Sequence, residues 1–358
     1  MTTVQMMLGD RSYPIRIRAG CLAEVGESAA SELGIDRVVV ITTPRVGAAW
    51  FATLARGMER ARVEVTRLDV PDGERAKTLR TASRIYDQLL DGGVDRQTFV
   101  MGLGGGAACD LTGYVASTWL RGVPLLQIPT TLLAQVDASV GGKTAVNHPR
   151  GKNLIGTFYQ PRQVWVDPEV LRTLPRREFR SGLAEVIKAG ALWDADFFAW
   201  LEREIEAVRA QEPEALVKAI TRAIEIKAEV VSLDEREGGL RALLNFGHTL
   251  AHAIENVAGY RRVRHGEAVA MGMVFACRLS QNKGRIGADV TGRVEDLLGR
   301  AGLATTPPDW SGQRDAYLRA IAVDKKVAGG KVGFVILGEL GRAEVLQLTP
   351  QEILETAT

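Results

Sequence analysis

The feature that most constrains the fold is the alternation of predicted strands with helical segments in the first half of the chain, beginning with a continuous apolar run at residues 37–41. Uninterrupted apolar runs are typical of strands that are buried on both faces of a sheet. Strands that alternate with helices predict a parallel sheet of the nucleotide-binding sort. The predicted strands cover residues 37–41, 63–68, 98–103, 125–128 and 164–167, and the helical segments cover 22–33, 47–58, 75–90 and 107–119. Residues 2–18 alternate around Gly9 and Asp10, which predicts a β-hairpin.

The pattern changes near residue 175, where helical periodicity takes over. We therefore predict two domains: a Rossmann-like α/β nucleotide-binding domain with a mostly parallel sheet over residues 1–176, and a mainly helical domain over residues 177–358. Helices are expected at 176–190, 194–209, 213–236, 247–258, 265–284 and 290–302, and strands only at 333–337 and 343–348.

Composition narrows the class of protein. The 358 residues carry 45 lysines and arginines against 43 acidic residues, so the charge gives no reason to propose nucleic acid or a membrane as a partner. The three cysteines are widely spaced, which argues against a disulfide framework. The N-terminus has no basic start followed by an apolar run, so no signal peptide is predicted. We expect a cytoplasmic enzyme.

Three of the four histidines lie between residues 248 and 265. His248 and His252 are four residues apart in a helical segment, which puts both imidazoles on one helix face. His265 opens the next predicted helix. Two such helices can bring His248 and His265 to one metal ion, but a third ligand must then come from elsewhere.

Glu185 is the best candidate for that ligand. It lies among apolar residues in the predicted helix 176–190, and a buried carboxylate needs a partner or a metal. Glu185 could pair with Lys188, one turn away, or it could complete a Glu/His/His set with His248 and His265. Three protein ligands with an open position are typical of a catalytic zinc site.

Three loops of the first domain suggest a dinucleotide. The glycines at 104–106 separate a strand from a helix, where a backbone without side chains can approach a pyrophosphate; the alternative is a tight turn that binds nothing. Residues 72–77 and 130–131 also follow strands. The polar segment 135–153 is interpreted as a loop whose Lys143 and Lys152 bind anions or are simply exposed, and His148 as a surface residue.

Taken together, these stretches resemble 3-dehydroquinate synthases, a family of sugar-phosphate cyclases. The resemblance appears in the family's order, covers roughly residues 60 to 330, and is highly specific. It rests on PDGE (71–74), GGG (104–106), PTTLLAQVD (129–137), VGGKT (140–144), GKNLIG (151–156), GLAEVIK (182–188), KAEVV (227–231), RALLNFGHT (241–249), HGEAVA (265–270) and DKK (324–326). One departure is Cys109, where the family usually has glycine; this cysteine requires a turn that tolerates a side chain.

The resemblance implies a role for each matching residue. The metal ligands, for Zn²⁺ or Co²⁺, would be Glu185, His248 and His265. The NAD-binding residues would be Asp72, Gly73, Glu74, Lys77, Gly105, Gly106, Asp110, Thr130, Thr131, Lys143 and Lys152, with residues 171–173 near the domain junction. The substrate-binding residues would be Arg121, Asp137, Lys143, Asn153, Lys188, Lys227, Arg241, Asn245, His252 and Lys325. Lys325 is favoured, although the sequence does not distinguish it from Lys326. The catalytic residues would be Lys188, Lys227, Arg241, Asn245 and His252.

The family reaction belongs to the shikimate pathway of aromatic amino acid biosynthesis. It converts 3-deoxy-D-arabino-heptulosonate 7-phosphate to 3-dehydroquinate and phosphate by transient NAD-linked oxidation, β-elimination of phosphate, re-reduction and intramolecular aldol closure. His252 is interpreted either as a group near the phosphate or as a packed histidine that orients a ligand. A homodimer is expected from the resemblance alone.

Rival interpretations are a related sugar-phosphate cyclase, such as an amino-dehydroquinate synthase, and a metal-dependent polyol dehydrogenase. The sequence at 141–144 and His252 favour dehydroquinate synthase over the cyclases that make inososes or valiolones, but they do not exclude the amino variant. A protein of another class, a non-catalytic binding protein descended from such an enzyme, is disfavoured by the complete set of metal and lysine residues.

Overall fold

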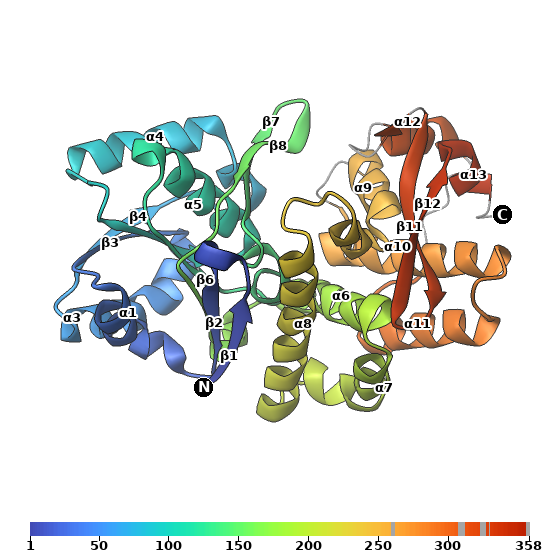
Figure 1. Ribbon diagram of the computed structural model, residues 1–358, viewed down its shortest axis with the longest axis horizontal. Coiled ribbons are helices and arrows are strands. Elements are labelled where there is room, and N and C mark those ends of the chain that lie inside the picture. Colours follow the sequence, from blue (N-terminus) through green and yellow to red (C-terminus); the bar gives the residue numbers. More distant parts are fainter. Residues whose placement is uncertain (259–261, 307–311, 323–326, 329, 356–358) are drawn as a thin grey trace. The chain divides into compact units, whose positions relative to one another are not determined.

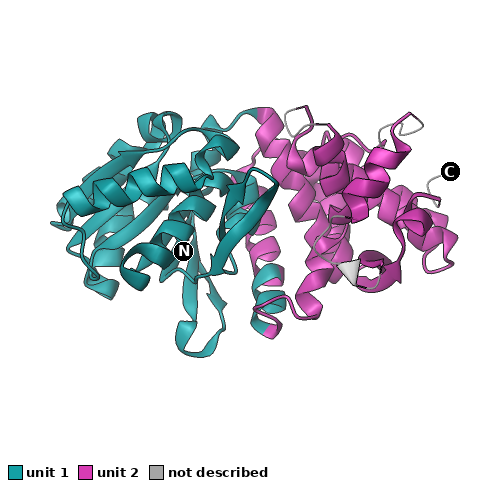
Figure 2. Cartoon of the chain, turned by 90° about the horizontal axis from the view of Figure 1, so that it is seen from above, with its two compact units in different colours: residues 1–175, 227–232 teal, residues 176–226, 233–358 magenta. Residues whose placement is uncertain are grey.

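The chain forms two compact units in the computed structural model, which describes residues 1–258, 262–306, 312–322, 327–328 and 330–355. The first unit contains residues 1–175 and 227–232, and the second contains 176–226 and 233–358 (Figure 2). The predicted domain limits of 1–176 and 177–358 stay a prediction. A compact unit of a structure is not necessarily a domain that folds by itself.

The first unit is built on a seven-stranded sheet in the order β1-β2-β9-β6-β5-β3-β4. The two N-terminal strands pair as the expected antiparallel hairpin, and every other pairing in this sheet is parallel. The fold-class prediction is therefore confirmed. The strands are β1 (Thr2–Met6), β2 (Tyr13–Ile17), β3 (Arg37–Thr42), β4 (Glu64–Asp69), β5 (Phe99–Gly104), β6 (Leu125–Pro129) and β9 (Gln163–Val166).

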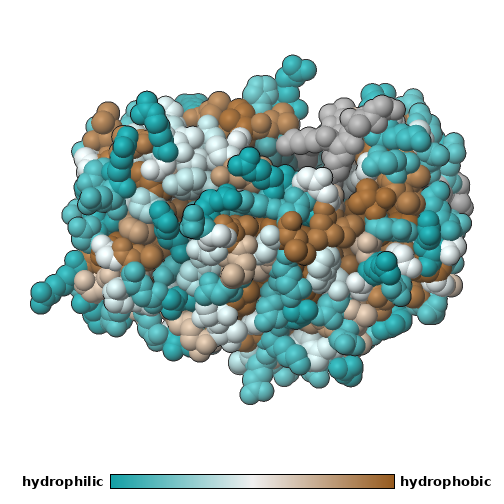
Figure 3. Space-filling view, in the orientation of Figure 1, coloured by the Kyte–Doolittle hydropathy of each residue, from teal (hydrophilic) through white to brown (hydrophobic). Residues whose placement is uncertain are grey.

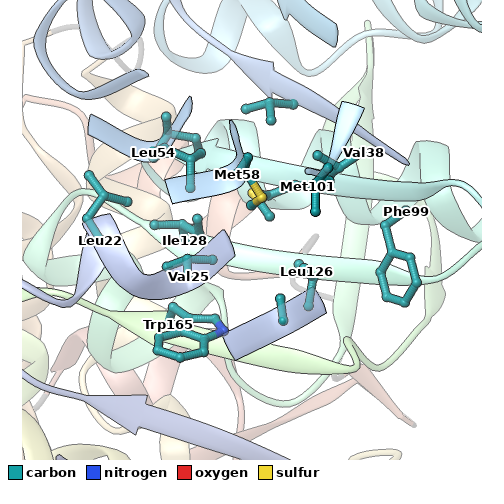
Figure 4. Close-up of a cluster of buried hydrophobic side chains, with 14 of the residues drawn as sticks. Leu22, Val25, Val38, Leu54, Met58, Phe99, Met101, Leu126, Ile128 and Trp165 are labelled. Carbon is teal, nitrogen blue, oxygen red and sulfur yellow. The ribbon is translucent and has the colours of Figure 1, made fainter. Parts of the chain in front are cut away.

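Helices cover both faces of this sheet (Figure 1). Side chains of β3 alternate: Val38 and Val40 join the cluster under α1 (Val25–Leu33) and α3 (Ala52–Arg60), as Figure 4 shows in part. Val39 and Ile41 join the cluster under α4 (Leu79–Asp91) and α5 (Gly106–Thr118). Burial on both faces explains why β3 reads as a continuous apolar run. Pro44–Val46 (α2) and the π-helical turn Gly47–Phe51 lead into α3.

Two local predictions for this unit are wrong. The polar segment 135–153 is not a loop: it contains a π-helical turn, Ala134–Ala138, and then the hairpin of β7 (Lys143–His148) and β8 (Gly151–Phe158). Its exposed strand residues hid the apolar alternation by which strands are recognised. Helix α4 begins at Leu79 rather than near 75, because Lys77 leaves the helical region (ψ 67°) and the Thr78 side chain caps the helix by accepting from the Thr81 amide.

The second unit is mainly helical, as predicted. Its helices are α6 (Arg176–Trp193), α7 (Ala195–Arg209), α8 (Pro213–Leu233), α9 (His248–Val257), α10 (His265–Asn282), α11 (Ala288–Arg300), α12 (Arg314–Ala322) and α13 (Pro350–Glu355). Residues 227–232 of α8 belong to the first unit. The antiparallel strands are β10 (Val327–Ala328), β11 (Lys331–Glu339) and β12 (Arg342–Leu348). Sequence periodicity predicted neither α12 nor α13.

Helix α10 packs against α6 and α9 in the second unit (Figure 1). The backbones of α10 and α6 approach so closely that a Cβ placed on Gly266 would lie 1.9 Å from the Ser181 carbonyl oxygen. The Gly266 amide donates to the Ser181 hydroxyl over 2.9 Å at the same contact. Glycine at this position therefore allows the N-terminus of α10, with His265, to lie directly against α6.

None of the helices in the described part of the chain is both long and apolar enough to cross a membrane. On the face shown in Figure 3, hydrophobic residues lie among hydrophilic ones.

We predict that Gly266→Ala destabilises the chain by about 1–3 kcal/mol, the usual cost of an added group in a packed interior. The matched control is Gly292→Ala in α11, where a Cβ would meet nothing within 4 Å. The control substitution should stabilise the chain slightly, because alanine has a higher helix propensity than glycine. Chemical denaturation of both variants measures the difference. Equal stability of the two variants would contradict the close approach.

Candidate metal centre and cofactor-binding residues

Glu185 lies on α6 as a buried carboxylate, with 3% of its side chain exposed. One oxygen, Oε2, forms an ion pair with the Lys188 ammonium one turn along the helix. The other, Oε1, has no hydrogen-bond partner among the described residues, although it is buried. It lies 3.5 Å from His248 Nε2 and 3.7 Å from His265 Nε2. Both roles considered for Glu185 in the sequence are thus compatible, because each uses a different oxygen.

His248 and His265 each begin a helix, α9 and α10 respectively. Gly247, just before His248, has φ 79°, a left-handed conformation that suits glycine. The Nδ1 atom of His248 lies 3.2 Å from the Phe246 carbonyl oxygen. Because a carbonyl oxygen only accepts hydrogen bonds, we assign the proton of His248 to Nδ1. The lone pair of Nε2 is then directed at Glu185.

The three side chains form a group suited to a metal ion. One ligand atom from each of Glu185, His248 and His265 lies within 4.8 Å of the others. A divalent ion would satisfy the buried Glu185 Oε1, and one carboxylate with two imidazoles is a donor set that zinc accepts. Burial lowers the pKa of His248 well below its usual value, and the positive charge of Lys188 adds to this effect. His248 is therefore neutral near pH 7, the form that binds metals.

His252 lies beside this group rather than in it. Its ring centroid is 5.7 Å from that of His248 and 6.4 Å from that of His265, while those two centroids are 5.2 Å apart. The residue is exposed on α9. His265, although seventeen residues from His248 in the sequence, is slightly nearer to it in space than His252 is.

Two carboxylates in the second unit were missed by sequence reasoning. Glu237 Oε1 accepts from Asn245 Nδ2 over 2.9 Å, and the same Nδ2 donates to the Ala242 carbonyl oxygen over 3.0 Å. Because both contacts use Nδ2, the carbonyl Oδ1 of Asn245 is the group oriented to accept from a ligand. Glu255 Oε2 lies 3.4 Å from His265 Nδ1. A signal for Glu255 did exist: it stands seven residues after His248, on the same helix face.

The cofactor-binding candidates of the first unit gather around Lys77, of which 2% is exposed. Lys77 Nζ lies 2.5 Å from Asp110 Oδ2 on α5 and contacts Asn153 Oδ1 on β8. Asn147 Nδ2 donates to Glu74 over 2.7 Å. Burial raises the pKa of Asp110, and Lys77 opposes that rise. Asn153, expected near the substrate, therefore stands with the cofactor-binding candidates.

The glycine loop lies so close to neighbouring side chains that an added Cβ would displace them. A Cβ on Gly105 would lie 2.9 Å from Thr131 Cγ2, and one on Gly106 would lie 3.2 Å from Ala138 Cβ. The hydroxyl of Thr130 is buried without a hydrogen-bond partner in the described structure. Helix α5 has no side-chain cap at its N-terminus. An uncapped helix N-terminus, a buried hydroxyl without a partner and a turn made of glycines together fit a pyrophosphate.

Cys109 is compatible with this loop because it is a residue of α5 rather than of the turn. Its Sγ lies 3.6 Å from the Gly104 carbonyl oxygen, and burial raises the pKa of the thiol. The side chain is therefore an inert part of the packing.

The remaining candidates are placed as follows. Asp137 pairs with Lys227 within the first unit, Nζ to Oδ1 over 2.5 Å. Arg241 is buried and contacts the Glu235 carbonyl oxygen in the second unit. Thr173, the last of residues 171–173, accepts from Trp50 Nε1 over 2.9 Å. Four further candidates are exposed, namely Asp72, Gly73, Arg121 and Lys143, and Lys152 is half-buried. Lys325, with Lys326, lies outside the described residues.

Comparisons with known proteins point to one family. Residues 67–181 match the family described as 3-dehydroquinate synthase N-terminal, and residues 182–327 match 3-dehydroquinate synthase C-terminal. A 3-dehydroquinate synthase of Geobacter metallireducens is 47% identical over 349 residues, which are 97% of this chain and 96% of that protein.

Solved structures show the same architecture. A 2-deoxy-scyllo-inosose synthase complexed with carbaglucose-6-phosphate, NAD⁺ and Co²⁺ has a TM-score of 0.88 at 26% identity, covering 99% of both chains. A 2-epi-5-epi-valiolone synthase of Streptomyces hygroscopicus with NAD⁺ and Zn²⁺ bound has a TM-score of 0.87 at 28% identity, covering 96% of this chain and 95% of that one.

We predict that Glu185→Gln loses most of its bound Zn²⁺, because an amide is a poor zinc ligand and Lys188 is left without its charge partner. Metal content after gel filtration measures the loss. Glu178→Gln is the control on the same helix, since Glu178 pairs with exposed Arg264 instead. Full metal content in Glu185→Gln would contradict the assignment.

Lys77→Met should destabilise the chain by up to about 3 kcal/mol and weaken NAD binding, because the partly buried Asp110 loses its main partner. The double variant Lys77→Met/Asp110→Asn should recover part of that stability, since it no longer buries an unpaired charge. Denaturation and NAD titration of both variants measure these effects. Strictly additive losses would show that the pair is not coupled.

Proposed function

The chain belongs to the 3-dehydroquinate synthase family, and we propose that it converts 3-deoxy-D-arabino-heptulosonate 7-phosphate to 3-dehydroquinate and phosphate. The observation that carries this proposal is the buried Glu185 oxygen directed at two imidazole nitrogens. This arrangement provides the metal-ligand set that the reaction needs, in a chain whose relatives catalyse it.

Glu185, His248 and His265 would hold a divalent metal, and the glycine loop with Lys77 and Asp110 would hold NAD. When bound, the metal supplies Lewis acidity toward substrate hydroxyls, and NAD supplies a reversible hydride acceptor. Lys188 pairs with the second oxygen of Glu185 and leaves the first oxygen directed at the two imidazoles. The tautomer of His248 is held by the Phe246 carbonyl.

The polar residues around the metal ligands suit a substrate with a carboxylate and a phosphate. Arg241 is buried with its guanidinium held by a backbone oxygen, which fixes its planar fork for an anionic group. Asn245 presents Oδ1 as an acceptor for a substrate hydroxyl, because its Nδ2 is already used. His252 is exposed beside the ligands and can donate to a phosphate oxygen or carry a proton.

In the first unit, Lys227 and Asp137 form a pair that we assign to substrate hydroxyls. Lys227 Nζ contacts both the Oδ1 and the backbone oxygen of Asp137, so the two side chains orient each other. A lysine held this way is a fixed donor, and the carboxylate beside it is a fixed acceptor. The homodimer and the cytoplasmic location stay predictions.

The second candidate is a related sugar-phosphate cyclase, favoured by the likeness to inosose and valiolone synthases. Identity to those two proteins is 26% and 28%, against 47% to a 3-dehydroquinate synthase, so we place it second. A metal-dependent polyol dehydrogenase would differ in its products: it would release NADH in proportion to the substrate consumed.

We predict that the full chain, given the heptulosonate phosphate with Zn²⁺ and NAD⁺, forms phosphate and dehydroquinate in equal amounts with no net change in NADH absorbance. Phosphate release, dehydroquinate absorbance and absorbance at the NADH maximum are followed together, with Glu185→Gln as the inactive control. Accumulation of NADH would favour a dehydrogenase. Release of phosphate from a hexose 6-phosphate, but not from the heptulosonate, would favour another cyclase.

A further inference from the structure

Glu255 is a buried acid on α9, with 8% of its side chain exposed, that contacts the metal-ligand candidate His265. Its Oε2 lies 3.4 Å from His265 Nδ1, while His265 Nε2 faces Glu185 Oε1 over 3.7 Å. We propose that Glu255 is a positioning residue that fixes the tautomer and ring orientation of His265 and thereby raises the affinity of the chain for its metal ion. This inference rests on the metal centre proposed above.

The helix geometry explains how Glu255 reaches that place. Glu255 follows His248 by seven residues, which is two turns, so both side chains project from the same face of α9. Helix α10 packs against that helix and begins with His265. Helix α9 therefore supplies one metal ligand from its first residue, and from a later turn the carboxylate that contacts the next ligand.

The two imidazoles are held in the same tautomer by different means. The Phe246 carbonyl, two residues away in the chain, accepts from Nδ1 of His248. His265 has 29% of its side chain exposed, against 12% for His248, and it is oriented by a carboxylate from another helix. A carboxylate makes a stronger hydrogen bond to an imidazole N–H than a neutral carbonyl does, and it raises the basicity of the metal-binding nitrogen.

Charge favours the same role. The negative charge of Glu185 is matched by Lys188, so these two side chains contribute no net charge to the centre. A divalent ion would add two positive charges, and in the described part of the chain Glu255 is a second carboxylate that contacts a ligand imidazole. Removing its charge should therefore weaken binding of the cation even where a hydrogen-bond acceptor of the same shape remains.

The test measures metal affinity instead of turnover. Co²⁺ is titrated into the metal-free, full-length chain and followed by its visible absorption, and a chelator competition gives the dissociation constant. The variants are Glu255→Gln, which keeps an acceptor but removes the charge, and Glu255→Ala, which removes both. We expect about a tenfold loss of affinity for Glu255→Gln and up to about a hundredfold loss for Glu255→Ala.

Glu267→Gln is the matched control. Glu267 stands two residues after His265, but its oxygens accept from the Arg177 guanidinium and from the Arg264 amide. Its loss should lower stability without changing Co²⁺ affinity by more than about twofold. Co²⁺ affinity and absorption unchanged from wild type in both Glu255 variants would overturn the proposal. Failure of the wild-type chain itself to bind Co²⁺ would overturn the metal centre, and the inference with it.

A second readout reports the tautomer directly. The chain has only four histidines, so their side-chain nitrogens can be resolved by NMR of the ¹⁵N-labelled, metal-free protein. His265 should carry its proton on Nδ1 in the wild type and become a mixture of tautomers in Glu255→Ala, while His248 stays unchanged. If Glu255→Ala does not fold, the Glu255→Gln affinity decides the matter. The same His265 tautomer in folded Glu255→Ala would contradict the proposal.

Discussion

The metal-ligand group of the second unit depends on the contacts of Glu185, whose two carboxylate oxygens have different neighbours. A carboxylate buried among the apolar residues of α6 is costly unless it is paired. Lys188 pairs with one oxygen, and the other is left toward His248 and His265 without a hydrogen-bond partner in the described structure. The close backbone contact at Gly266 brings α10, and with it His265, near enough to α6 for this geometry. The metal ion that we propose for this site would complete the coordination of the unpaired oxygen.

The first unit also contains a buried lysine paired with a carboxylate, next to its glycine loop. Lys77 is almost fully buried, and its ammonium lies between Asp110 of α5 and Asn153 of β8. This joins the segment after β4, the helix that follows the loop, and the β7–β8 hairpin. Lys227 and Asp137 form a similar pair among the proposed substrate-binding residues. The metal, cofactor and substrate sites that we propose thus each contain a lysine whose position is fixed by a carboxylate. A chain with a net charge of only +2 concentrates its cationic groups locally in this way.

Much of this could be predicted from the sequence, and the failures have physical reasons. The apolar runs predicted the parallel sheet, because burial on both faces selects continuous hydrophobicity, as in β3. The sequence also indicated the metal ligands Glu185, His248 and His265. An acid among apolar residues and a cluster of histidines are both rare, so they stand out in a sequence. The β7–β8 hairpin was missed, since its strands are largely exposed and polar. Glu255 was missed because its significance depends on where His265 lies, and helix packing sets that position. Helix α12 lacked a long enough periodic pattern.

The most direct test of the account is a crystal structure of the Co²⁺-loaded full chain with anomalous diffraction recorded at the cobalt edge. The account predicts one anomalous peak, bonded to Glu185 Oε1, His248 Nε2 and His265 Nε2 at about 2.0–2.2 Å, with at least one further position open. A peak bonded to His252 in place of His265, or no peak among these side chains, would contradict it.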